Sequence, residues 1–281
     1  MNIKDYGLKK ENILKKNDKN KIIARIIATH KDRYEIVCNN GNGFAKIKRG
    51  CYYDNPNSIY PTTGDFVLIE WNKFGDSMIY ETLKRESYFS RTAASSDRNR
   101  ELHSQHEQLV AANFDYVFIM QSLNNNFNIN RIERYLSLAW ESGGIPVIIL
   151  TKSDLVQNVQ DYIDEVQRIA FGVDVYAISC INKNGIEDIK KYFSKGNTIV
   201  FLGSSGVGKS TLVNIADYFW IFTLILCPSW SGIELMTVGT CYIGDVPDGI
   251  GTCTILQGST GHGIGELLHL LGSICQSVPG T

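Results

Sequence analysis

A glycine-rich segment at residues 203–210 has the composition and spacing of a phosphate-binding loop. It reads GSSGVGKS and fits G-x-x-x-x-G-K-[ST]. The apolar run IVFL precedes it, and TLVNIA follows with the character of a helix. Glycines let the backbone approach phosphate oxygens, and the N–H groups at a helix start attract anions. A glycine-rich turn that matches by chance is the alternative, and the flanking strand and helix argue against it.

Each position of this segment has an expected task. We expect Lys209 to reach the β- and γ-phosphates of a nucleotide, and the hydroxyl of Ser210 to be a ligand of Mg²⁺. The other predicted phosphate-binding residues are Gly203, Ser204, Ser205, Gly206, Val207 and Gly208.

A second motif, Thr151-Lys152-Ser153-Asp154, fits the [NT]-K-x-D pattern that reads guanine. The carboxylate of Asp154 can accept hydrogen bonds from guanine N1–H and the 2-amino group, a donor pair that adenine lacks. The stem of Lys152 can lie over the base, and Thr151 can bond within the loop. The alternative is a helix N-cap at Ser153 or Asp154. The motif follows the apolar strand predicted at 147–150, and ligands of open α/β sheets bind at such strand ends.

Ser179 and Cys180 lie at the end of another predicted strand, 173–179, where a short loop could donate to guanine O6. The alternative is an ordinary strand end. The chain order is unusual, because Lys152 precedes Lys209 by 57 residues, whereas the phosphate loop ordinarily comes first. Both loops can still meet at one edge of a circularly permuted sheet.

The elements that must hold these loops alternate in type. Apolar runs at 116–120, 147–150, 173–179 and 199–202 predict buried strands. Helical spacing of apolar residues predicts helices at 129–142, 161–170 and 186–193. Strands alternating with helices predict an α/β domain with a parallel sheet covered on both faces.

The segment before this domain has a different pattern. Five short runs rich in Ile, Val, Tyr and Phe predict a small β-barrel, and the OB-fold is the commonest such barrel. The polar connector at 85–112 carries Arg85, Arg91, Arg98 and Arg100, which suit either a nucleic-acid contact or a solvated linker. The predicted boundaries are a flexible, Lys-rich lead-in at 1–20, a barrel at 21–84, the connector at 85–112, the α/β domain at 113–214 and an atypical tail at 215–281.

Composition limits the class of protein. A hydrophobic fraction of 43% and a charged fraction of 20% fit a globular protein. The N-terminus has no apolar core of a secretory signal, so we expect the seven cysteines to be reduced thiols in the cytoplasm. The most apolar run, 219–227, is shorter than the roughly 20 residues that span a membrane. It favours a buried helix or strand, and we expect no membrane association.

Residues 107–155, together with GSSGVGKSTLVN, resemble the small ribosomal subunit biogenesis GTPases (RsgA, the YjeQ/YloQ group). The resemblance covers about residues 20–214. It implies a cytoplasmic, circularly permuted P-loop GTPase that follows an OB-fold, binds 16S rRNA and acts late in maturation of the 30S subunit, which stimulates its GTP hydrolysis. It implies that 151–154 hold the guanine of GTP or GDP and that Thr211 joins the phosphate site. We expect a monomer.

After Asn214 the chain departs from this family. The expected Gly-Arg-His-Thr-Thr and Asp-Thr-Pro-Gly segments are missing, so the sequence identifies no catalytic residue. Residues 210–281 hold five acids and no Lys or Arg, which a frameshift or a divergent end would explain. The four cysteines of this tail are too widely spaced to support the family's zinc site. A nucleotide- and RNA-binding module without hydrolysis is therefore an alternative, and a P-loop ATPase or small-molecule kinase is a second one.

Overall fold

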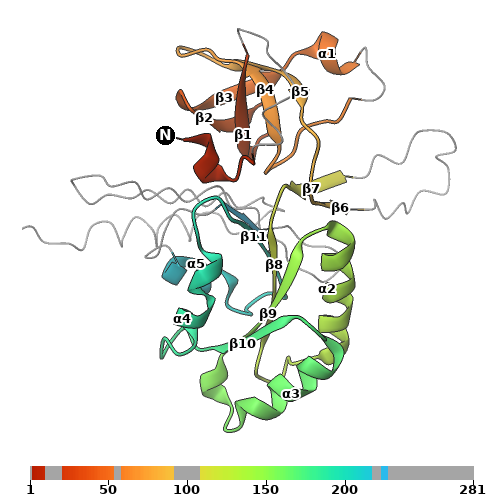
Figure 1. Cartoon of the computed structure of the whole chain (residues 1–281), viewed down its shortest axis with the longest axis vertical. Coiled ribbons are helices and arrows are strands. Elements are labelled where there is room, and N and C mark those ends of the chain that lie inside the picture. The colour runs from red at the N-terminus through yellow and green to blue at the C-terminus, as the bar shows by residue number, and fades with distance from the viewer. Residues whose placement is uncertain (1, 10–20, 54–57, 92–107, 217–222, 227–281) are drawn as a thin grey trace, which may run out of the picture.

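The computed structural model describes residues 2–9, 21–53, 58–91, 108–216 and 223–226. The described residues form a barrel and a parallel-sheet domain, which lie end to end with a short strand pair between them (Figure 1). The tail is therefore described only at residues 215–216 and 223–226. The four tail cysteines considered for zinc lie outside the described residues.

Five strands close into the predicted barrel. They are β1 (Ile22–Thr29), β2 (Tyr34–Cys38), β3 (Gly41–Ile47), β4 (Phe66–Glu70) and β5 (Ser77–Thr82), with the short helix α1 (Arg49–Tyr53) after β3. Their order is β1-β2-β3-β5-β4, with β3 parallel to β5 and β1 antiparallel to both β2 and β4. This closed five-stranded arrangement confirms the predicted OB-fold. Alternate residues such as Ile26, Ile36 and Ile69 fill its interior.

The start of the chain differs from the predicted lead-in. Residues Ile3–Tyr6 form a short 3-10 helix capped by Asn2. Ile3, Tyr6 and Leu8 are buried against Phe66 and neighbouring apolar residues of the barrel. This segment is therefore anchored to the barrel by three apolar side chains, while Asn2, Lys4 and Lys9 remain exposed. Residues 10–20 lie outside the described residues.

The described part of the connector forms two strands. It contains β6 (Tyr88–Arg91) and β7 (Gln108–Ala112), which pair antiparallel. Arg85 is not a solvated side chain, because it donates to the fully buried Asp65 carboxylate at 2.6 and 2.8 Å. The solvated-linker alternative therefore fails at Arg85. Arg98 and Arg100 lie outside the described residues.

The second domain is the predicted parallel α/β sheet. Its strands are β8 (Tyr116–Ser122), β9 (Ile145–Thr151), β10 (Asp174–Ile178), β11 (Thr198–Leu202) and β12 (Thr223–Leu226). Its helices are α2 (Ile129–Ser142), α3 (Val159–Ile169), α4 (Ile186–Ile189) and α5 (Lys209–Ala216). The sheet order is β10-β9-β8-β11-β12, and all neighbours are parallel. The predicted helix at 186–193 is the short α4 followed by one 3-10 turn.

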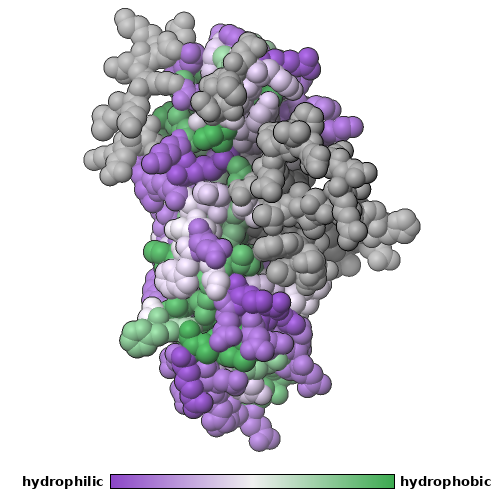
Figure 2. Space-filling model, turned by 90° about the vertical axis from the view of Figure 1, so that its right-hand side faces the viewer, coloured by the Kyte–Doolittle hydropathy of each residue, from purple (hydrophilic) through white to green (hydrophobic). Residues whose placement is uncertain are grey.

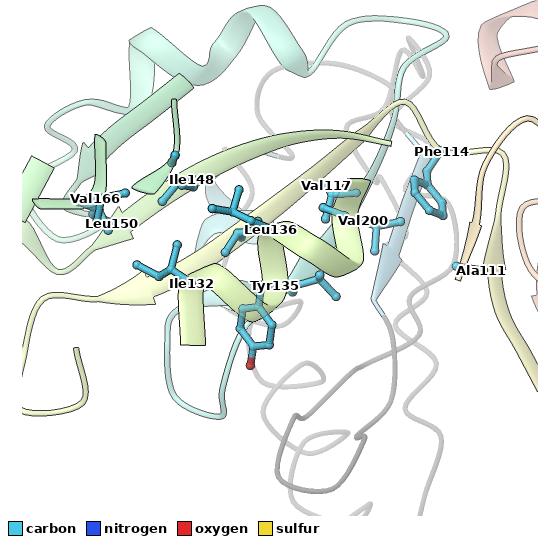
Figure 3. Packing of buried hydrophobic residues seen from close by; sticks show 14 of the residues in the cluster. Ala111, Phe114, Val117, Ile132, Tyr135, Leu136, Ile148, Leu150, Val166 and Val200 are labelled. Carbon is cyan, nitrogen blue, oxygen red and sulfur yellow. The ribbon is translucent and has the colours of Figure 1, made fainter. Parts of the chain in front are cut away.

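Helices cover both faces of this sheet, as Figure 1 shows. On one face, residues of α4 and α5 pack on the aromatic and branched side chains of the strands, including Phe118 and Phe201. On the other face, Ile132, Tyr135 and Leu136 of α2 pack on strand residues such as Ile148 (Figure 3). The strands are apolar on both faces because both faces are covered. Part of the tail's apolar run, β12, joins the sheet beside β11.

One side chain joins the barrel to the sheet. Arg25 of β1 is fully buried. Its guanidinium donates to the carbonyl of Tyr6, to Thr198 Oγ1 at 2.9 Å and to the carbonyl of Asn113 at 2.8 Å. Burial lowers the pKa of Arg25 to about 10. Thr198 begins β11, the strand that leads into the phosphate loop, so the barrel is anchored at the base of that strand.

Candidate nucleotide-binding site

The loop between β11 and α5 has the backbone shape that a phosphate group needs. Gly206 and Gly208 have φ values of 71° and 102°, a region that favours glycine. A Cβ at Gly206 would meet no atom within 4 Å, so the loop is open there. A Cβ at Gly203 would lie 2.7 Å from the main-chain oxygen of Met120, so this glycine is needed for close packing. The residues present therefore fit a phosphate chain.

Lys209 and Ser210 begin α5 at the end of this loop. Lys209 is buried, and its Nζ donates to the carbonyls of Gly203 at 2.9 Å and Ser204 at 2.8 Å. These contacts hold the ammonium group against the loop, where it can also meet anionic oxygens. Ser210 and Thr211 are exposed in the first turn of the helix. Val207 points the other way, into the apolar core.

The motif at 151–154 follows β9 and contacts the loop between β11 and α5. Thr151 is buried, and its Oγ1 donates to the carbonyl of Val207 at 2.6 Å. Lys152 has a left-handed backbone with φ 59°, which turns the chain into the 3-10 turn Ser153–Leu155. That turn has no side-chain cap, and α3 begins only after Asn158. The helix-cap alternative for Ser153 or Asp154 therefore finds no support.

Ser179 and Cys180 lie beside Asp154. Ser179 is fully buried, and its Oγ donates to Asp154 Oδ1 at 2.5 Å while accepting the N–H of Asn182 at 3.2 Å. Burial, and to a smaller degree the charge of Asp154, raises the pKa of the half-buried Cys180 thiol. The segment after β10 is therefore part of the same site as the segment after β9, with the carboxylate of Asp154 held by a neighbouring hydroxyl.

The sequence did not single out the loop after β8. Asn126 in this loop donates from Nδ2 to Ser204 Oγ at 3.3 Å. A run of three asparagines before a helix was the available signal, and it is also typical of an ordinary turn.

The described residues also bear on two other classes of site. Within those ranges, no cluster of three or more His, Cys, Asp or Glu side chains could hold a metal ion. No helix in the described part of the chain has the length and apolar character to cross a membrane.

Comparisons with known proteins agree with this geometry. Residues 83–217 match the family model described as RsgA GTPase. The chain is 41% identical over 191 residues to small ribosomal subunit biogenesis GTPase RsgA 1 of Listeria monocytogenes, covering 68% of this chain and 51% of that protein. It is 34% identical over 218 residues to RsgA 2 of Lactiplantibacillus plantarum, covering 76% and 59%. The chain thus spans between half and three-fifths of these relatives.

Solved structures give the same fold. The crystal structure of YjeQ from Thermotoga maritima superposes with a TM-score of 0.56 at 22% identity, covering 70% of this chain and 65% of that one. The crystal structure of YloQ, described as a circularly permuted GTPase, gives 0.52 at 24% identity, covering 71% and 66%. At these identities the likeness concerns the fold, and it agrees with the permuted order of the two nucleotide loops.

Proposed function

We propose, from the match of residues 83–217 to the RsgA GTPase family model, that this chain binds and hydrolyses GTP during maturation of the small ribosomal subunit. The relatives it matches are named for that role. The chain spans only part of the length of these relatives, so GTP hydrolysis and the ribosomal partner are proposals for this chain.

The contact between Thr151 and Val207 carries the proposal. It joins the [NT]-K-x-D loop to the phosphate loop, so one ligand that has both a guanine and a phosphate chain can meet both. Asp154 would accept the two guanine donors, and Ser179 would hold that carboxylate in place. An adenine nucleotide would offer Asp154 no such pair, which argues against the ATPase and kinase alternatives.

Mg²⁺ bound with GTP would neutralise charge on the β- and γ-phosphate oxygens. Ser210, which is exposed in the first turn of α5, would be its protein ligand. Lys209 would add a fixed positive charge, and the N–H groups around Gly206 and Gly208 would orient the phosphate chain. The described residues do not include a candidate for positioning the attacking water.

We infer that the barrel contributes the RNA contact, with 16S rRNA of the 30S subunit as partner and the cytoplasm as the place of action. Basic groups lie over aromatic rings on its surface: the Arg33 guanidinium is 3.8 Å from the centroid of Phe44, and Lys48 Nζ is 4.3 Å from that of Tyr80. Such pairs suit phosphates and stacked bases. Hydrophilic residues also predominate at both ends of the face shown in Figure 2. We propose that the chain acts as a monomer.

GTP turnover by the full chain, with and without 30S subunits, tests the proposal. We expect turnover that rises with the subunit and is lost in Lys209→Ala. A folded chain that binds GTP but does not turn it over would favour the alternative of a binding module without hydrolysis. The missing family segments after Asn214 are the reason for that alternative. Tighter binding of ATP than of GTP would overturn the guanine assignment.

A further inference from the structure

We propose that Asn126, supported by Arg131, is a positioning residue for the phosphate loop and thereby strengthens binding of the β-phosphate. The inference rests on the proposed function, because it concerns the same nucleotide site. Both residues come from the β8–α2 segment, which belongs to neither nucleotide-binding motif.

The contact reaches the phosphate loop at its second residue. The side-chain amide of Asn126 donates to Ser204 Oγ at 3.3 Å, across 78 residues of sequence. The main-chain carbonyl of Ser204 accepts from Lys209 Nζ at 2.8 Å. Ser204 is therefore held on two sides, by Asn126 through its side chain and by Lys209 through its backbone.

Asn126 is itself held in place by three polar groups. Its carbonyl accepts from the buried Gln121 amide at 2.6 Å, and its N–H donates to Asn124 Oδ1 at 3.0 Å. Arg131 Nη1 lies 3.2 Å from Asn126 Oδ1 and 3.4 Å from its carbonyl oxygen. The guanidinium therefore fixes the amide so that its nitrogen faces Ser204, and a charged donor makes such a bond stronger than a neutral one.

Capping of α2 does not explain this arrangement. The N-cap of α2 is Asn128, whose Oδ1 accepts the N–H of Arg131 at 3.1 Å. The side chain of Asn126 is exposed, so it is not required to fill the core. Its amide instead contacts the phosphate loop. A loop that is restricted before the ligand binds loses less conformational entropy on binding.

The test compares GDP with GMP, since the loop residues that Asn126 restrains surround the phosphates farther from the ribose. Affinities are measured on the full chain by competition against a fluorescent GDP analogue. We expect Asn126→Ala to lower the GDP:GMP affinity ratio about three- to tenfold, the range of one net hydrogen bond. Ser204→Ala should lower the ratio similarly, and the double variant should be no worse than either single one.

Arg131 gives a second and independent variant. Arg131→Gln should lower the same ratio, and Arg131→Lys should restore part of it, because a cation is kept without the planar group. Arg134→Gln, on an exposed position of the same helix, is the matched control and should leave the ratio unchanged. The melting temperature is recorded for every variant.

The outcomes distinguish a failure of the proposed function from a failure of the proposed role of Asn126. A wild-type chain that binds no guanine nucleotide would overturn the proposed function and this inference together. Tight GDP binding by wild type with an unchanged GDP:GMP ratio in Asn126→Ala would overturn the inference alone. Equal losses for GDP and GMP with a lower melting temperature would mean that Asn126 has only a structural role.

Discussion

The hydroxyl of Thr151 donates to the main-chain carbonyl of Val207 at 2.6 Å, although the two residues are 56 positions apart and come in the reverse of the usual order. Both residues are buried. The bond joins the end of β9 to the loop that follows β11, and β8 lies between these two strands in the sheet order. The reversed chain order therefore still brings the loop at 151–154 into contact with the loop at 203–210.

We predict that Thr151→Val destabilises the protein and weakens GDP binding. Valine keeps the shape of threonine but removes the donor, which leaves the buried Val207 carbonyl without this partner. The expected loss in the free energy of unfolding is about 1–3 kcal/mol, measured by urea denaturation. The control, Ser137→Ala, removes an exposed hydroxyl that donates to the main-chain carbonyl of Glu133 within α2. It should change the free energy of unfolding by less than about 0.5 kcal/mol. Equal stabilities for the two variants would contradict the prediction.

Changing Asp154 to Asn should alter the choice of base. The substitution replaces one carboxylate acceptor with a donor, so it should weaken GTP binding by at least about tenfold, as expected for a hydrogen bond to a charged group. Xanthosine nucleotides present an acceptor at that edge, so they should bind the variant more tightly than they bind the wild-type protein. Competition among GTP, XTP and ATP measures the effect, with Asp161→Asn, at an exposed position of α3, as the control. An unchanged order of preference would refute the role of Asp154.

The local parts of this structure were predictable from the sequence. The strands and α2 follow from the period of apolar residues, and α2 runs over the predicted Ile129–Ser142. The loops at 151–154 and 203–210 could be singled out because each motif is a short run in which every residue type has an expected chemical task. Their position at strand ends then followed from the rule for open α/β sheets.

The parts that could not be predicted depend on contacts between distant residues. Arg25 reads as an ordinary polar position in a strand, yet it is buried through a bond to Thr198, 173 residues away. Arg85 lies in a polar segment that is typical of a solvated linker, but its side chain donates to Asp65, a buried residue just before β4 of the barrel. Ile3 and Tyr6 lie among lysines and an aspartate, so composition alone favoured solvent for a segment that is in fact packed.

The Cys180 thiol should react slowly and with a distinct pH dependence. Its pKa is raised by burial and then by Asp154, so its thiolate fraction at a given pH is below that of an ordinary cysteine. The alkylation rate should therefore keep rising with pH above the ordinary thiol value of about 8.5. Asp154→Asn removes one cause of the shift and should speed alkylation at pH 8 in the nucleotide-free protein. Mass spectrometry of the Cys180 peptide measures the rate, and equal rates in both proteins would contradict the prediction.

The logarithm of the RNA affinity of the full chain should fall linearly with the logarithm of the salt concentration. The reason is that RNA phosphates release counterions when basic side chains bind them. Arg33→Gln and Lys48→Gln should each reduce the magnitude of that slope by about one if each contacts a phosphate. Lys183→Gln, in the GTPase domain and away from the barrel, should leave it unchanged. Filter binding of 16S rRNA fragments between low and moderate salt gives the slopes. A flat response in wild type would argue against the RNA contact of the barrel.

Arg25→Met should loosen the joint between the barrel and the GTPase domain. The variant removes the donor for the carbonyls of Tyr6 and Asn113 and for Thr198 Oγ1, in a place that water does not reach. We expect the free energy of unfolding to fall by at least about 2 kcal/mol, since buried acceptors lose their partner. Arg134→Met, at an exposed position of α2, is the control and should change it little. Hydrogen exchange at β11 should rise in Arg25→Met but not in the control. Unchanged stability and exchange would mean that other contacts hold the two domains together.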